Sequence, residues 1–165
     1  MPDYPQSILE KYRSKGILID TNLMVLIAVG TYNPQRVLTF KRTRQYALDD
    51  LVLMTRLMSY FGRRVTTPNI LTEVDNLTRQ LPEAEYEAIA ATVARLVPDF
   101  FEVYFPSEGA LNNVHYPLLG LTDCVTASAA RDVLVVTDDF RLSNVLSGLG
   151  YDAININHIR SQVWF

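Results

Sequence analysis

Five carboxylates stand where they could act as one group, and all five belong to short polar motifs: Asp20, Glu73, Asp123, Asp138 and Asp139. Asp20 ends the apolar run "GILID", and Asp138 and Asp139 follow directly on "VLVVT". Pooled carboxylates repel one another, and their pKa values rise unless a cation lies among them. Hard divalent ions such as Mg²⁺ and Mn²⁺ prefer oxygen ligands. These residue types therefore predict a metal site.

The expected chemistry is attack of water on a phosphoryl group. A divalent ion held by carboxylates activates a water molecule and neutralises charge during in-line displacement. Asn22 could add an amide oxygen or contact a phosphate, and Thr21 and Thr137 could hold waters or orient ligands. Asn22 and Thr137 are therefore candidate substrate-binding residues.

Strand and helix patterns alternate along the chain and would bring these side chains together. Short apolar runs typical of buried strands occur at residues 17–19, 63–68, 100–105, 133–137 and 151–157. Helical spacing or helix start signals occur at residues 23–29, 47–62, 69–81, 82–97, 121–132 and 138–150, whereas residues 106–117 are expected to form a loop. Such alternation predicts an α/β fold with a parallel sheet and helices on both faces. Ligands collect at the carboxyl ends of the strands in these sheets, where the acids fall.

Composition favours one ordinary globular domain over residues 1–165. Hydrophobic residues make up 48% of the 165, and no apolar run is long enough to cross a bilayer. No signal-peptide pattern opens the chain, and the single cysteine, Cys124, permits neither an internal disulfide nor a thiolate zinc cluster. A cytoplasmic location without membrane contact is expected.

The acidic motifs together resemble the PIN domain, a family of small metal-dependent nucleases that includes toxin ribonucleases of toxin–antitoxin pairs. The resemblance rests on "LIDTN", "LTEV", "LTDCVTASAA" and "VVTDD" in this order, and it covers residues 16–156. It implies a three-layer α/β/α sandwich with a central, mainly parallel sheet. The interval between Asp20 and Glu73 is longer than in the compact toxins, so the resemblance carries over the chemistry more directly than the substrate.

The resemblance also implies the activity and its residues. It implies hydrolysis of RNA phosphodiester bonds with Mg²⁺ or Mn²⁺ held by Asp20, Glu73, Asp123 and one of the last two aspartates. Family members more commonly use the acid two residues after the threonine, here Asp139, and Asp138 stays open. RNA is the implied substrate, and an antitoxin protein and a second copy of the chain are implied partners.

The net charge of −3 at pH 7 means that nucleic-acid binding would need a local basic patch. The densest positive cluster is Lys41, Arg42 and Arg44, together with Arg63 and Arg64. The aromatic residues Tyr32, Phe40 and Tyr46 lie nearby. Basic and aromatic side chains could hold a phosphate backbone and stack bases. An exposed loop with ordinary solubilising charge is the alternative interpretation.

Other interpretations of the motifs remain open. Asp20 and Asp123 taken singly would be helix caps, and Asn69 is a candidate cap for the helix that follows it. A Ser-His-Asp hydrolase would need His115 or His158 and a G-x-S-x-G elbow, which is absent. A chain that resembles the haloacid-dehalogenase-like, metal-dependent phosphatases would have a D-x-D motif after the first strand. Here Asn22 stands at the position of the second aspartate. A catalytically inactive interaction module on the same fold is the third alternative.

Overall fold

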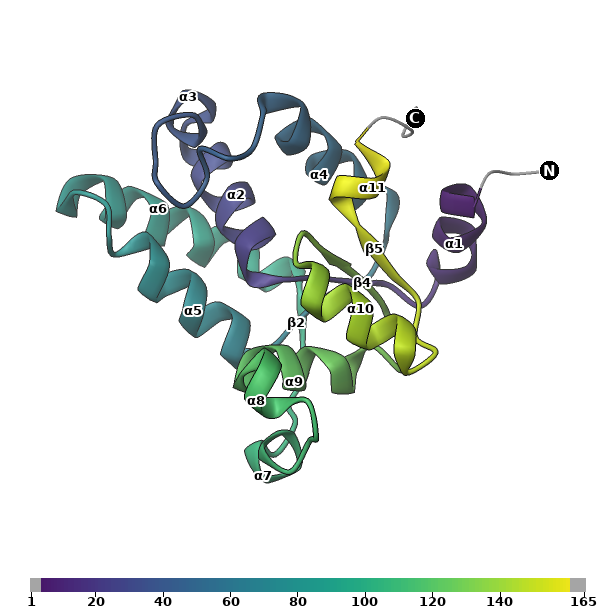
Figure 1. The fold of residues 1–165 in the computed structure, drawn as a ribbon. Helices are drawn as coiled ribbons and strands as arrows, with labels where there is room; N and C mark the ends of the chain where they lie inside the picture. Colours follow the sequence, from purple (N-terminus) through teal and green to yellow (C-terminus); the bar gives the residue numbers. More distant parts are fainter. Residues whose placement is uncertain (1–3, 161–165) are drawn as a thin grey trace.

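The computed structural model describes residues 4–160. The C-terminal Trp164 and Phe165, for which the sequence favours packing against the core, lie outside the described residues. Five parallel strands form one sheet in the order β3-β2-β1-β4-β5 (Figure 1). The strands are β1 (Ile17–Ile19), β2 (Arg64–Thr66), β3 (Phe101–Glu102), β4 (Leu134–Thr137) and β5 (Ala153–Asn155). Chain order reverses between β1 and β4, so these two strands flank the point at which sheets of this class bind ligands.

Helices connect each strand to the next and cover both faces of the sheet. The segments before β3 contain α1 (Tyr4–Tyr12), α2 (Thr21–Tyr32), α3 (Pro34–Val37), α4 (Leu48–Tyr60), α5 (Pro68–Thr78), α6 (Glu83–Leu96) and the 3-10 helix η1 (Val97–Asp99). The later helices are α7 (Ser107–Leu111), α8 (Tyr116–Leu119), α9 (Leu121–Ala129), α10 (Phe140–Gly148) and α11 (Ile156–Ile159). Because α2 contacts α3, α4, α5 and α6, whereas α10 contacts α8 and α9, these helices form two layers, which meet where α5 contacts α9 (Figure 1). The predicted three-layer α/β/α sandwich is confirmed.

The central helix α2 is buried almost all round, because the apolar run from Leu23 to Val29 faces the sheet on one side and neighbouring helices on the other. In β4, Leu134 and Val136 join the large core around α2, while Val135 packs with Leu142 of α10. Such alternation is the period-two pattern of a strand covered on both faces. The apolar strand sequences therefore fix both helical layers.

The backbone at position 16 accepts only glycine, which has no side chain. The φ of Gly16, 106°, is rarely adopted by other residues, and a Cβ there would lie 2.6 Å from the carbonyl oxygen of Arg63. The close approach lets Ile17 N–H donate to Arg63 at the start of the β1–β2 pair. Glycine at this position therefore sets where β1 begins.

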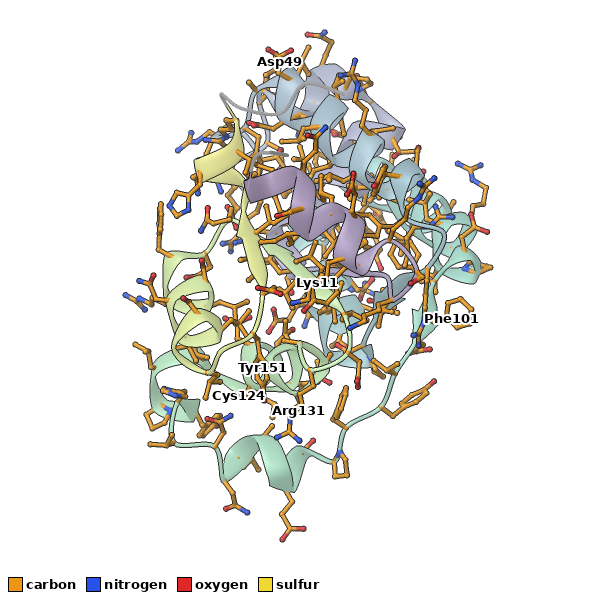
Figure 2. The ribbon with its side chains drawn as sticks, turned by 90° about the vertical axis from the view of Figure 1, so that its right-hand side faces the viewer. Lys11, Asp49, Phe101, Cys124, Arg131 and Tyr151 are labelled. Atoms are coloured by element: carbon orange, nitrogen blue, oxygen red, sulfur yellow. The ribbon has the colours of Figure 1, made fainter. Side chains whose placement is uncertain are left out.

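The edge of the sheet at which the strands begin is closed by polar contacts. Lys11 and Tyr12 of α1 donate to Asp152 at 2.5 and 3.1 Å, and Arg131 at the end of α9 donates to Tyr151 at 3.1 Å (Figure 2). Cys124 is fully buried in the middle of α9 and packs with Ala110 and Val125, as expected of a packing residue. In residues 4–160, none of the helices is both long enough and apolar enough to span a membrane.

Several local predictions were wrong. Asn69 does not cap a helix: Thr67 caps α5 by accepting from Ile70 N–H, because Pro68 takes the first helical position. The expected loop of residues 106–117 contains α7 and the start of α8. Phe40 and Tyr46 are 3% and 2% exposed, so they pack into the core and cannot stack on bases.

Candidate active site

Asp20 connects the end of β1 to the start of α2 and is only 5% exposed. Its Oδ1 accepts from Leu23 N–H at 3.3 Å, so it does cap the helix. Its Oδ2 accepts from the hydroxyl of Thr137, the last residue of β4. Asp20 is therefore both a helix cap and a carboxylate fixed between the two central strands.

Asp138 and Asp139 follow β4 and play different parts. Asp139 caps α10, and its Oδ1 accepts from the N–H groups of Arg141 and Leu142 at 2.6 and 3.3 Å. Asp138 accepts from Tyr46 at 2.5 Å and from the Asn22 amide at 3.5 Å. One carboxylate is thus held by a helix end, and its neighbour by side chains from distant segments.

Glu73 reaches the same edge from α5. Its two carboxylate oxygens accept from Thr21 at 3.1 Å and from Thr122 at 2.6 Å. These hydroxyls come from the first turn of α2, which follows Asp20, and from the first turn of α9, which contains Asp123. Two threonines therefore join three of the elements that bear the predicted acids.

Burial and the negative charges of the neighbouring carboxylates raise the pKa values of Asp20 and Asp123. Burial and then the charge of Asp138 raise the pKa of Asp20 to about 8, although hydrogen bonds from Thr137 and Leu23 lower it. Burial, followed by the charges of Asp139 and Glu73, raises the pKa of Asp123 to about 7. Within residues 4–160, no Lys, Arg or His forms an ion pair with any of these five carboxylates.

The kinds of oxygen atom at this edge of the sheet are those that bind hard divalent ions. Carboxylate, hydroxyl and amide oxygens line this edge, and Mg²⁺ is typically bound by one or two carboxylates together with water and substrate phosphate. Among the described residues, no three His, Cys, Asp or Glu side chains are arranged as a ready-made metal cage. In this arrangement the protein side chains therefore do not form a complete coordination sphere, and water or a substrate phosphate would have to supply the remaining ligands.

The remaining candidates fall into two groups. Thr137 is fully buried, which does not fit the expected contact with substrate; it positions Asp20 and accepts from Asp139 N–H at 2.9 Å. Asn22 is exposed beside Asp138. Lys41, Arg42 and Arg44 are exposed in the segment between α3 and α4, and Arg42 donates to Gln80 at 2.9 Å.

Sequence reasoning missed the part that Tyr46 plays at the site, and it missed Thr122 altogether. Burial and the neighbouring Asp138 carboxylate raise the pKa of the Tyr46 hydroxyl, which keeps it a donor to Asp138. Tyr46 lies in the segment between α3 and α4, as do the three basic residues above, and ties that segment to the site. No local signal marks it, because the contact joins residues 92 apart in the chain.

No family model matches the chain, and a search among curated proteins finds no match either.

Proposed function

We propose that this chain is a Mg²⁺- or Mn²⁺-dependent ribonuclease of the PIN type that hydrolyses RNA phosphodiester bonds. The observation that carries the proposal is the gathering of five carboxylates from four segments at the carboxyl edge of β1 and β4, without a basic partner among the described residues. Raised pKa values at Asp20 and Asp123 indicate that the cluster is short of positive charge. A divalent ion supplies that charge, activates water and neutralises the phosphoryl group when bound.

The protein's own residues would orient the ligands. Asp20, Glu73, Asp123 and Asp139 are the residues proposed to hold the metal, directly or through its bound water, and Asp138 stays the alternative to Asp139. Thr137 and the α2 backbone hold Asp20, while Thr21 and Thr122 hold Glu73. Because hydroxyl donors stabilise a carboxylate without neutralising it, the acids stay available to a cation.

Two alternatives receive less support. A phosphatase of the D-x-D type would have a second aspartate two residues after Asp20, but Asn22 stands there. An inactive interaction module does not account for a cluster of acids in which hydroxyl groups orient the ligands. Toxin function, with an antitoxin or a homodimer as partner, is a narrower proposal that rests on the family resemblance alone.

The decisive experiment is cleavage of labelled single-stranded RNA, tRNA and single-stranded DNA with Mn²⁺, Mg²⁺ or EDTA. The variants are Asp20→Asn and Asp123→Asn. Asp132→Asn is the matched control, because Asp132 is exposed and precedes β4 at the opposite edge of the sheet. We expect metal-dependent RNA cleavage that both site variants lose and the control keeps.

Two results would count against this assignment. Cleavage that persists in Asp20→Asn with unchanged metal dependence would remove Asp20 from the site. Absence of both cleavage and calorimetric metal binding in the wild-type protein would favour the interaction module.

A further inference from the structure

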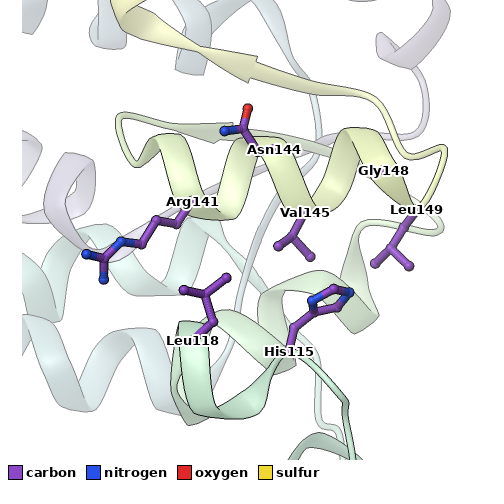
Figure 3. Close-up of a pocket in the computed structure, with 7 residues that line it drawn as sticks. All are labelled: His115, Leu118, Arg141, Asn144, Val145, Gly148 and Leu149. Atoms are coloured by element: carbon purple, nitrogen blue, oxygen red, sulfur yellow. The ribbon is translucent and has the colours of Figure 1, made fainter.

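A groove of about 400 Å³ lies between α8 and α10 (Figure 3). His115 and Leu118 line it from the α8 side, and Val145 and Leu149 face them from the α10 side. Arg141 stands at the end nearest the start of α10. Pockets of this volume, with apolar walls and a few polar groups, are typical of sites for small molecules or single nucleotides.

The groove is built from elements that adjoin the acidic site. Arg141, which lines it, donates its backbone N–H to Asp139 at 2.6 Å. Gly120 alone separates α8 from α9, and Asp123 lies in the first turn of α9. Both walls therefore lead directly into elements that carry proposed metal ligands.

The chemistry of the walls changes along the groove. Leu118 and Leu149 are 52% and 44% exposed, so a flat apolar group would cover surface that now faces water. The His115 imidazole adds a planar ring beside them. A nucleobase has the shape and faces that such a slot accommodates.

Arg141 supplies the complementary charge. It is exposed, and within residues 4–160 its side chain forms no ion pair. A guanidinium binds phosphate through paired N–H donors. From Arg141 to Leu149, α10 advances roughly 12 Å, at about 1.5 Å per residue. The groove thus presents a phosphate-binding group beside the acids and an apolar slot beyond it.

We propose that this groove holds a nucleotide of single-stranded RNA next to the cleaved bond, with its phosphate on Arg141 and its base between Leu118 and Val145. The inference rests on the proposed ribonuclease activity and adds the place at which a substrate nucleotide is held. A base can enter the slot only when it is unpaired, because duplex RNA keeps its bases stacked inside the helix. Single-stranded RNA is therefore preferred over duplex RNA.

Gly148 allows the groove to be blocked without disturbing the fold. It lines the groove, and a Cβ added there meets no atom within 4 Å. Gly148→Trp would place an indole in the slot. Gly109→Trp is the matched control, because Gly109 is also an exposed helical glycine with open space around it, lies in α7 and does not line the groove.

The test measures binding and cleavage separately. Binding of a labelled oligouridylate and of a duplex RNA of equal length is measured by fluorescence anisotropy in EDTA, and steady-state cleavage is measured with Mn²⁺. We expect Gly148→Trp to raise Kd and KM for the single strand by about tenfold or more, the loss expected from one base-stacking contact. Arg141→Gln should raise KM in the same direction, while Gly109→Trp should match the wild-type protein.

The outcomes separate the two proposals. If the wild-type protein cleaves RNA but Gly148→Trp binds and cleaves it equally well, the groove is not a substrate site, and the ribonuclease proposal stands. Equal cleavage of duplex and single-stranded RNA overturns the placement of an unpaired base in the groove. A wild-type protein that neither binds nor cleaves RNA overturns both proposals.

Discussion

Thr137 links the ends of the two central strands through one hydroxyl. That hydroxyl donates to Asp20 and accepts from the N–H of Asp139, so it uses both of its hydrogen-bonding functions. No solvent reaches it. Its part is to orient a carboxylate, which is the role that partners behind a metal ligand usually play.

Replacing Thr137 by Val removes the hydroxyl and keeps the shape. We expect Mn²⁺ affinity to fall by about 10–100-fold, because Asp20 loses the donor that orients its carboxylate. Isothermal titration calorimetry measures the affinity, and circular dichroism checks the fold.

Thr66→Val is the control for the Thr137 experiment. Thr66 is equally buried, and its Oγ1 has no hydrogen-bond partner in the described part of the chain. This change should leave Mn²⁺ affinity unaltered. Equal affinities for Thr137→Val and the wild-type protein would show that the hydroxyl does not orient a ligand.

For single residues, sequence reasoning found the acids of the site but not their hydrogen-bond partners. Asp20 and Asp139 follow apolar strand runs, and a local pattern suffices to place them. Tyr46 was instead a candidate for stacking on bases, because the polar residues around it suggest an exposed loop. Its burial against Asp138 depends on contacts far apart in the chain, which no local window contains.

At the scale of elements, the start of α10 joins a structural and a chemical role in Asp139. Both capping N–H groups donate to Oδ1. Among the hydrogen bonds of residues 4–160, none ends on Oδ2 of Asp139. One oxygen therefore stabilises the helix while the other can serve a metal.

Asp139→Asn separates these roles. The amide oxygen still caps α10, so the free energy of unfolding should change by less than about 1 kcal/mol. RNA cleavage should fall by about 100-fold or more, since the stabilisation supplied by a bound metal ion is worth several kcal/mol. Urea unfolding and cleavage rates measure the two effects.

Asp138→Asn is the comparison for Asp139→Asn. Cleavage that survives in Asp139→Asn but disappears in Asp138→Asn would assign the metal to Asp138 instead.

The longer elements were predictable and the short ones were not. The strand runs at residues 17–19 and 133–137 and the helical spacing from Leu48 onward are strong patterns, and the structure confirms them. The helices α7 and α8 contain five and four residues, too few to show a helical period. Isolated helices this short are not stable in water, so their packing against α9 and α10 decides their existence.

At the scale of the whole molecule, the acidic cluster makes stability depend on pH. The pKa values of Asp20 and Asp123 are about 8 and about 7 in the folded protein, against an ordinary value of 3.8. Between the ordinary pKa of 3.8 and these folded pKa values, the folded state binds more protons than the unfolded state. The free energy of unfolding therefore falls as pH rises, and the contribution of these groups levels off above their folded pKa values.

The prediction concerns thermal unfolding in EDTA and in Mn²⁺ at pH 5 and pH 8. In EDTA the Tm should be lower at pH 8 than at pH 5. Metal binds the deprotonated acids, so Mn²⁺ should raise Tm strongly at pH 8 and little at pH 5; saturation at 100 times Kd adds about 2.7 kcal/mol. Asp20→Asn should flatten the pH dependence and reduce the Mn²⁺ effect.

Asp132→Asn serves again as the control and should follow the wild-type protein. A Tm in EDTA that rises from pH 5 to pH 8 would contradict the charge balance described for the cluster.

The acids come from distant parts of the chain, and this has a consequence for the order in which the protein is made. Asp20 is synthesised early, but Thr137, which holds it, follows 117 residues later. A growing polypeptide that has not yet reached residue 137 contains neither this partner nor the last aspartates. The proposed nuclease is therefore harmless to the message from which it is translated until that point has been passed.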